Sequence, residues 1–313
     1  MKNFTFLFPG QGAQYVGMGA DFFSAFSEVQ RLFEQAEDIL KRKLKNIVFE
    51  GPESLLKETN HSQIAIYLNS MSILSILQKE MPHIIPTFCA GLSLGEYSAL
   101  TAASYISFID CLSLIDARAK FMVEACRSIE GTMAAVMGLS GELIENSLQA
   151  LKKQNQVWIA NFNSPVQTVI SGTIKGVEHG TKLLIEAGAK KIIPLKVDGA
   201  FHSPLMQIAQ DRLREVLAEV SLSIGNSQLV MNKTGGVVND IEEIRDNLAK
   251  HVTSPVRWVE SMSNINKKTD LFIEIGCGKT LMGLNKQIGV KAPTLNLNSV
   301  EGLKDLFVKL ENF

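Results

Sequence analysis

Short apolar runs alternate with longer amphipathic runs along the N-terminal third of the chain. Short apolar runs are typical of buried strands, and apolar positions three and four residues apart are typical of helices. The alternation favours an α/β fold with a largely parallel sheet. The predicted elements are strands at 4–8 and 84–90, the second interrupted by Pro86, and helices at about 18–40, 63–78 and 96–106.

The order of predicted elements changes from about Gly131. A strand, a helix, two short strands around "NFNSP", a second helix and a last strand follow one another, which is the βαββαβ order of a ferredoxin-like unit. The predicted ranges are 133–139, 142–152, 157–161, 167–171, 176–187 and 191–197. After Gly199 a helix at about 204–220 and a strand at 271–275 are expected.

This change predicts two units. Residues 1–128 and 198–313 are expected to form a large domain, and residues 129–197 an inserted small subdomain. A cleft between two such units is the natural place for a binding site.

Composition and charge narrow the possible functions. The 313 residues are 46% hydrophobic, which supports a substantial core, and 31 basic against 32 acidic side chains give no global field for nucleic acid or an anionic membrane. The first apolar run is broken too early, by Pro9 and Gly10, for a signal peptide, and no later run could span a bilayer. A cytoplasmic protein is therefore expected. The cysteines are widely spaced and are expected to be reduced core residues, without a metal: Cys89, Cys111, Cys126 and Cys277.

The stretch "GLSLG" at 91–95 places Ser93 between two glycines at a predicted strand-to-helix junction. This pattern is typical of a nucleophile elbow, a turn so sharp that flanking side chains would collide with neighbouring backbone. Glycine and serine are also ordinary turn residues, so the motif alone leaves a purely structural role open.

A serine nucleophile needs a positioned base to take its proton. His202 is the best candidate, because "DGAFHSPLM" places it directly before a predicted helix, with Ser203 as the N-cap and Pro204 at the first helical position. A histidine that merely packs at a domain edge is the alternative. Three other histidines have loop-like or helix-surface contexts: His61, His83 and His179.

An acyl-transfer site also needs N–H donors for the oxyanion that forms when serine attacks a carbonyl. In an elbow one donor is the backbone N–H of the residue after the nucleophile, here Leu94. The second could come from "FPGQGAQ", where Gly10 and Gly12 allow the main chain around Gln11 to approach a ligand. A glycine-rich turn after a strand is the structural alternative.

Arg118 emerges from an apolar stripe of the helix predicted at 108–128. A buried arginine needs a carboxylate, and its planar fork suits bidentate binding. The partner could be an internal Asp or Glu or the carboxylate of a ligand, and both alternatives stay open.

The stretch "GCGKT" at 276–280 resembles the end of a P-loop. That motif needs a glycine five residues before Gly278, where the chain has Ile273. The glycines are instead expected to turn the strand that ends at Ile275 into the next helix.

Eight ordered motifs give the chain a specific resemblance along nearly its full length. It resembles the malonyl-CoA:acyl carrier protein transacylases, which are freestanding acyltransferases of fatty acid and polyketide synthesis. The resemblance implies an α/β-hydrolase-like large domain with an inserted ferredoxin-like subdomain. The motifs are "FPGQGAQYVGMG", "GLSLGEYSAL", the Arg118 helix, "GTMAAVMG", "IANFNSPVQTVISG", "GAFHSPLM", "SPVRW" and "EIGCGKTLMGL".

The resemblance also assigns roles to matching positions. It implies that Ser93 is the nucleophile, His202 the general base and later acid, and Arg118 the partner of the malonyl carboxylate. Gln11 and Leu94 resemble the oxyanion donors. Two further assignments concern substrate binding: Asn161 and Asn163 near the thioester or pantetheine arm, and Phe201 as the residue that leaves room for malonyl and disfavours an α-methyl branch.

His251 departs from the family's pattern, because relatives usually carry glutamine at the start of "HVTSPVRW". A main-chain carbonyl in this region is thought to orient the catalytic histidine, and a carbonyl survives a side-chain change. A second imidazole could alter the pH dependence by repulsion or by sharing a proton. Asp198 is the alternative orienting group.

The function implied by the resemblance is ping-pong transfer of malonyl from coenzyme A to the phosphopantetheine thiol of an acyl carrier protein. The expected substrates are malonyl-CoA and the holo carrier protein, with no cofactor, no metal, no nucleic acid and no membrane partner, and the expected state is a monomer. A serine thioesterase or hydrolase and a catalytically silent carrier-binding module are the alternatives.

Overall fold

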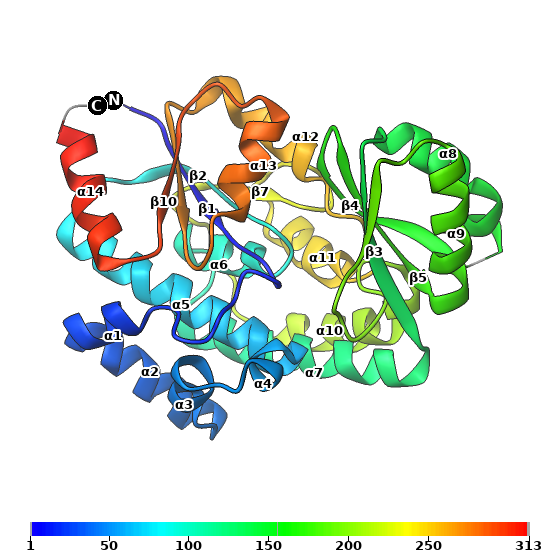
Figure 1. Ribbon diagram of the computed structural model, residues 1–313. Coiled ribbons are helices and arrows are strands. Elements are labelled where there is room, and N and C mark those ends of the chain that lie inside the picture. The colour runs from blue at the N-terminus through cyan, green and yellow to red at the C-terminus, as the bar shows by residue number, and fades with distance from the viewer. Residues whose placement is uncertain (1, 155, 312–313) are drawn as a thin grey trace.

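The computed structural model describes residues 2–154 and 156–311 and contains two separate sheets (Figure 1). One sheet has six strands and the other has four. The larger sheet is ordered β10-β9-β1-β2-β7-β8, and its strands are β1 (Phe4–Phe8), β2 (Pro86–Gly91), β7 (Gln228–Met231), β8 (Gly236–Val238), β9 (Leu271–Ile275) and β10 (Thr294–Leu297). The smaller sheet is ordered β4-β5-β3-β6, and its strands are β3 (Gly131–Met137), β4 (Val157–Ser164), β5 (Gln167–Thr173) and β6 (Lys191–Pro194).

Strand β1 shows why the larger sheet is buried. All five of its residues are buried, and it pairs in parallel with both β2 and β9. Successive side chains of a strand point to opposite faces, so Phe6 packs in one core cluster while Leu7 packs in another, which includes Trp258. Continuous apolar strands are typical of parallel sheets covered on both faces, and only β8 pairs antiparallel here. The fold class predicted from the sequence is confirmed.

Helices cover both faces of the larger sheet (Figure 1). The helices before the small sheet are α1 (Ala20–Ala25), α2 (Ser27–Leu40), α3 (Leu44–Phe49), α4 (Glu53–Lys57), α5 (Thr59–Glu80), α6 (Gly95–Ala102) and α7 (Phe108–Ser128). Those after it are η1 (Pro204–Met206), α10 (Gln207–Glu219), α11 (Ile241–His251), α12 (Trp258–Ile265), η2 (Asn266–Lys268), α13 (Thr280–Ile288) and α14 (Val300–Glu311).

The small antiparallel sheet follows the predicted βαββαβ order, with helices α8 (Gly141–Lys153) and α9 (Ile174–Glu186) on one face (Figure 1). Alternation separates its two faces. Ala134, Val136 and Ile170 pack in a core cluster that includes residues of α8 and α9. Their neighbours Ala135 and Val169 pack instead in the cluster that contains residues of the larger sheet. We propose that residues 129–197 form a subdomain, because all four strands of this sheet fall within that range.

Several predicted boundaries are wrong. The helix expected at 18–40 is two helices, because Phe26 is extended, with φ −130° and ψ 120°, and its N–H closes the last turn of α1 on Phe22. The helix expected at 96–106 ends at Ala102, and Ser104 then takes a left-handed φ of 66°. The C-terminal region also holds elements that the sequence pattern did not indicate: β7, β8, α11, α12, β10 and α14.

Two other expectations concern single segments. The "GCGKT" glycines do turn β9 into the segment before α13, because Gly276 and Gly278 have φ values of 133° and 76°. All four cysteines are free thiols, as expected. Among the described residues, no helix is long and apolar enough to cross a membrane.

Candidate active site

Ser93 lies at the junction of β2 and α6, where close backbone contacts require both flanking glycines. A Cβ atom on Gly91 would lie 2.0 Å from the backbone of Gly95. A Cβ atom on Gly95 would lie 2.1 Å from the carbonyl oxygen of Phe8. Ser93 itself has a φ of 51°, in the left-handed region that residues with a Cβ avoid. A tight turn with a strained serine at its apex has the geometry of a nucleophile elbow.

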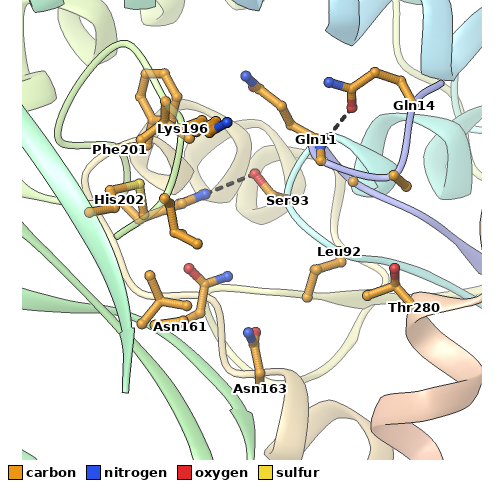
Figure 2. Close-up of a pocket in the computed structure, with 18 of the residues that line it drawn as sticks. Gln11, Gln14, Leu92, Ser93, Asn161, Asn163, Lys196, Phe201, His202 and Thr280 are labelled. Atoms are coloured by element: carbon orange, nitrogen blue, oxygen red, sulfur yellow. Dashed lines mark hydrogen bonds between the residues drawn. The ribbon is translucent and has the colours of Figure 1, made fainter. Parts of the chain in front are cut away.

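His202 reaches Ser93 from the loop before η1 (Figure 2). Its Nε2 atom lies 2.8 Å from Ser93 Oγ. Its Nδ1 atom faces two carbonyl oxygens, that of His251 at 3.0 Å and that of Ser254 at 3.2 Å. Carbonyl oxygens can only accept, so Nδ1 carries the proton and Nε2 accepts the hydrogen bond from the serine hydroxyl. The structure thus brings together the two residues that the sequence proposed as nucleophile and base.

The protonation state of His202 suits a general base. Burial, followed by the nearby Arg118 guanidinium, lowers the pKa of His202 to about 4, although the two carbonyl acceptors oppose the shift. The imidazole is therefore neutral near pH 7 and can take a proton from Ser93.

Gln11 lies in the turn after β1, and Leu94 lies between Ser93 and the first residue of α6. Within residues 2–154 and 156–311, neither backbone N–H donates to a protein acceptor. Free backbone N–H groups beside a nucleophile are suited to bind an oxyanion.

Arg118 lies on α7 and is only 1% exposed. Its Nη1 donates to Gln63 Oε1 at 2.5 Å, and its guanidinium lies 5.3 Å from the centre of the Tyr97 ring. Its Nε and Nη2 atoms have no hydrogen-bond partner in the described part of the chain. The internal ion pair that the sequence left open is therefore not formed among these residues.

A cavity of about 420 Å³ lies between the serine elbow and the small sheet. Ser93 and His202 lie on its wall, whereas Arg118 lies behind the wall residue Gln63. Phe201 also lines the cavity, beside Lys196 in the view of Figure 2. Alternate residues of β3, β4 and β5 supply the opposite wall: Met133, Ala135, Asn161, Asn163, Gln167 and Val169.

Asn161 and Asn163 are both largely buried, at 7% and 8% exposure, on the face of β4 toward the cavity (Figure 2). Asn163 Oδ1 has no hydrogen-bond partner among the described residues. A buried amide oxygen without a partner favours a ligand that can donate a hydrogen bond to it.

His251 supplies its carbonyl to His202, and its own ring is fully buried 5.0 Å from the His202 ring. Burial, followed by the neighbouring His202 imidazole, lowers the pKa of His251 well below its usual value. Its Nδ1 lies 3.4 Å from Glu96 Oε1 but lacks the geometry of a hydrogen bond. A neutral imidazole forms no ion pair with Glu96. When Glu96 is protonated, the contact joins two uncharged groups. Burial raises the pKa of Glu96 to about 8, which favours that state near pH 7.

Asp198 is not the group that orients His202. Its Oδ2 accepts a hydrogen bond from Thr59 Oγ1 at 2.7 Å, whereas two main-chain carbonyls occupy His202 Nδ1. The expectation of Asp198 as an alternative is therefore wrong.

Comparison with known proteins identifies the family. The family model described as the acyl transferase domain matches residues 5–292. The chain belongs to the acyl transferase domain family. The resemblance inferred from the eight motifs is confirmed.

Curated relatives that align with almost the whole chain share one name. A malonyl CoA-acyl carrier protein transacylase of Bacillus subtilis is 39% identical over 306 residues, which cover 97% of this chain and 96% of the relative. A protein of the same name from Escherichia coli K12 is 35% identical over 289 residues, covering 92% and 93%.

Solved structures match the fold of this acyl transferase equally well. The MCAT of Streptococcus pneumoniae has a TM-score of 0.92 at 38% identity and covers 98% of this chain and 100% of that one. A malonyl-transacylase in complex with a type II PKS acyl-carrier protein has a TM-score of 0.94 at 34% identity and covers both chains fully.

Sequence reasoning missed three buried polar residues of the acyl transferase site, namely Gln63, Glu96 and Asn232. Each makes a hydrogen bond to a site residue or to its support. Gln63 and Glu96 lie on helices, where buried polar side chains at apolar positions could have signalled a role. Nothing in the sequence around Asn232 distinguishes it from an ordinary turn asparagine.

Proposed function

We propose that this acyltransferase moves a malonyl group from malonyl-CoA to the phosphopantetheine thiol of an acyl carrier protein through a malonyl ester on Ser93. The observation that carries the proposal is the 2.8 Å contact between Ser93 Oγ and a neutral His202. Both residues line the cavity, and Arg118 lies behind its wall. Curated relatives and solved structures that match nearly the whole chain are malonyl transacylases by name.

In the first half-reaction Ser93 Oγ attacks the thioester carbonyl, and its proton passes to His202 Nε2. The carbonyl oxygen becomes an oxyanion that accepts hydrogen bonds from the N–H groups of Gln11 and Leu94. The carbon–sulfur bond then breaks, and coenzyme A leaves as a thiol with the proton from His202. The malonyl group remains as an ester on Ser93.

The second half-reaction reverses these steps with the carrier thiol as nucleophile. His202 takes the thiol proton, the sulfur attacks the malonyl ester, and Ser93 leaves with that proton. Asn161 and Asn163 line the cavity, and we expect their amides to bind the pantetheine arm, which carries amide groups of its own. His251 and Ser254 keep the imidazole in the productive tautomer throughout.

Arg118 selects the malonyl group in this proposal. Its free Nε and Nη2 atoms can donate hydrogen bonds to the carboxylate once the Gln63 amide moves aside, because Gln63 is the hydrogen-bond partner that separates the guanidinium from the cavity. A charge-assisted bidentate contact in a buried site is strong and geometrically specific. Holding the acyl end in this way also disfavours attack by water.

A cytoplasmic location, a monomeric state and independence from any cofactor complete the proposal. Light scattering of the purified protein would test whether it is a monomer. Transfer assays after exhaustive dialysis against a chelator would test whether activity is independent of a cofactor.

The decisive experiment is intact-mass analysis after incubation with malonyl-CoA, followed by addition of the holo carrier protein. We expect a malonyl adduct that maps to Ser93 and then moves to the carrier. Ser93→Ala should give no adduct. Ser98→Ala is the matched control, because Ser98 is a fully buried serine on α6, the helix that follows Ser93, and should leave the adduct intact.

Two outcomes separate this function from its alternatives. Free malonate as the main product at saturating carrier would indicate a hydrolase. A wild-type protein that never carries malonyl on Ser93 would indicate a silent carrier-binding module.

A further inference from the structure

Asn232 follows β7, is 1% exposed and has all its backbone and side-chain polar atoms in hydrogen bonds. Its side chain contacts the serine elbow, with Oδ1 accepting from Ser93 N–H at 2.8 Å and Nδ2 donating to the Gly91 carbonyl at 2.6 Å. Its backbone N–H donates to Glu96 Oε2 at 2.5 Å, and its carbonyl accepts from Arg257 N–H at 2.9 Å. A buried residue with this many partners fixes the segments that it joins.

The side-chain contacts hold the strained part of the elbow. Ser93 has a left-handed φ, a conformation that persists only where the surroundings impose it. The Asn232 amide binds the N–H of this residue and the carbonyl at the end of β2, two residues earlier. It therefore spans the turn and holds its open side.

The backbone contacts reach the histidine. Arg257, which donates to the Asn232 carbonyl, is three residues beyond Ser254, whose own carbonyl accepts from His202 Nδ1. The same segment is fixed to the small sheet, because Val256 N–H donates to the Ala160 carbonyl at 2.8 Å. Asn232 thus joins the elbow to the segment that orients His202.

Glu96 holds Asn232 in place from the first turn of α6. Its Oε2 accepts from the Asn232 N–H whether the carboxyl is charged or protonated, and its Oε1 lies against the His251 ring. His251 is the other residue whose carbonyl accepts from His202. One buried carboxyl therefore touches both the support of the nucleophile and the support of the base.

We propose that Asn232 is a positioning residue for the acyl transfer, fixing Ser93 relative to His202, and that Glu96 positions Asn232. Neither side chain touches the acyl group. The proposal rests on the proposed roles of Ser93 and His202, but it adds the statement that their 2.8 Å contact depends on a third and a fourth side chain.

The first test replaces Asn232 by alanine and measures the pre-steady-state rate of Ser93 acylation. We expect a loss on the order of 10²-fold, the scale of a misplacement of about 1 Å between reacting groups. The loss should be equal for malonyl-CoA and acetyl-CoA and should fall on the maximal rate, with the half-saturating donor concentration unchanged, because every acyl group uses the same elbow.

Asn285→Ala is the matched control. Asn285 is 2% exposed and also donates through Nδ2, to Thr294 Oγ1 at 3.0 Å, but its side chain has no contact with the dyad. It should lower the melting temperature without lowering the acylation rate of the protein that remains folded. An equal rate loss in both variants would indicate general destabilisation and overturn the proposal.

Glu96 gives a second test that does not depend on the folding of the Asn232 variant. Glu96→Gln keeps an oxygen that can accept from Asn232 N–H, whereas Glu96→Ala removes it. We expect Glu96→Ala to reduce acylation by both donors about 10-fold or more, and Glu96→Gln to recover most of that loss. Equal rates in the two Glu96 variants would contradict the role of Glu96.

Failure of this inference can be told apart from failure of the proposed function. A wild-type protein that forms malonyl-Ser93, together with an Asn232→Ala variant that acylates at the wild-type rate, would overturn only the positioning role. A wild-type protein without any adduct would overturn the function itself.

Discussion

The site has two ends that are built differently: the dyad in the cavity, and the guanidinium behind the cavity wall. At the reaction end, both nitrogens of His202 have partners, and Asn232 binds the Ser93 backbone. At the far end, Arg118 has one hydrogen bond, to Gln63, and two nitrogens without a partner among residues 2–154 and 156–311.

The difference teaches which interactions the substrate has to supply. The reaction end is organised in advance, as is expected where developing charge must be met without rearrangement. The guanidinium end is incomplete, and a buried charged group with unmet hydrogen bonds gains most from a ligand that meets them. A carboxylate on the acyl group would complete it. Chemistry and selectivity should therefore respond separately to mutation.

The largest expected effect comes from breaking the reaction end. His202→Ala should lower the rate of acyl transfer on the order of 10⁵- to 10⁶-fold, because removal of a nucleophile's base disables the dyad as a unit. Malonyl and acetyl donors should lose equally in a stopped-flow acylation assay. His179→Ala, an exposed histidine on α9, serves as the control. A His202 variant that keeps substantial activity would show that another group takes the serine proton.

The next effect comes from the other end. Arg118→Ala should lower the specificity constant for malonyl-CoA about 10²- to 10³-fold, within the range for removing one partner of a buried charged contact. Acetyl-CoA should be used as well as before or better. Competition assays with both donors would measure the ratio, with the exposed Arg214→Ala as the control. Equal losses of activity with the two donors would contradict the proposed role of Arg118 in binding the malonyl carboxylate.

A smaller effect is expected from the cavity wall. Phe201 is 5% exposed and lines the cavity, so Phe201→Ala should make room for an α-methyl branch. The preference for malonyl over methylmalonyl should fall about 10-fold, since one methyl group is worth about 1–3 kcal/mol in such pockets. Phe307→Ala, exposed on α14, should leave the preference unchanged. An unaltered preference in the Phe201 variant would place the discrimination elsewhere.

The smallest expected effect is a shift of the acidic limb of the pH–rate profile, which reports the electrostatic interaction between Arg118 and His202. With acetyl-CoA, acylation by the wild-type protein should lose rate as the pH falls through about 4, the pKa of His202. The Arg118 guanidinium disfavours the imidazolium, so Arg118→Ala should raise the pKa of His202 and move the limb to higher pH. An unmoved limb would show that the two ends are electrostatically independent.

Local sequence was enough to predict an element where the geometry of a short motif requires particular residue types. The spacing of Gly91, Ser93 and Gly95 predicted the elbow, because a Cβ atom on Gly91 would clash with the backbone of Gly95 in the same turn. The need for glycine at 95 is not local, since a Cβ atom there would clash with Phe8 of the neighbouring strand β1. The helix predicted at 108–128 has those bounds in the structure, as α7 (Phe108–Ser128), because its apolar stripe is continuous. The small sheet was predicted because short strand-like and helix-like segments follow one another in a βαββαβ order.

Tertiary structure alone decided what supports these residues. The hydrogen bond from Ser93 to Asn232 spans 139 residues, and those from His202 end on main-chain carbonyls. Every residue has such a carbonyl, so no residue type marks the ones that orient His202, and Asp198 was a false alternative for that reason. The chain itself determined which chemical groups are present and how they turn locally. Only the packing of distant segments determined which buried groups meet, because hydrogen-bond partners depend on positions within an ångström and side-chain spacing along the sequence does not encode them.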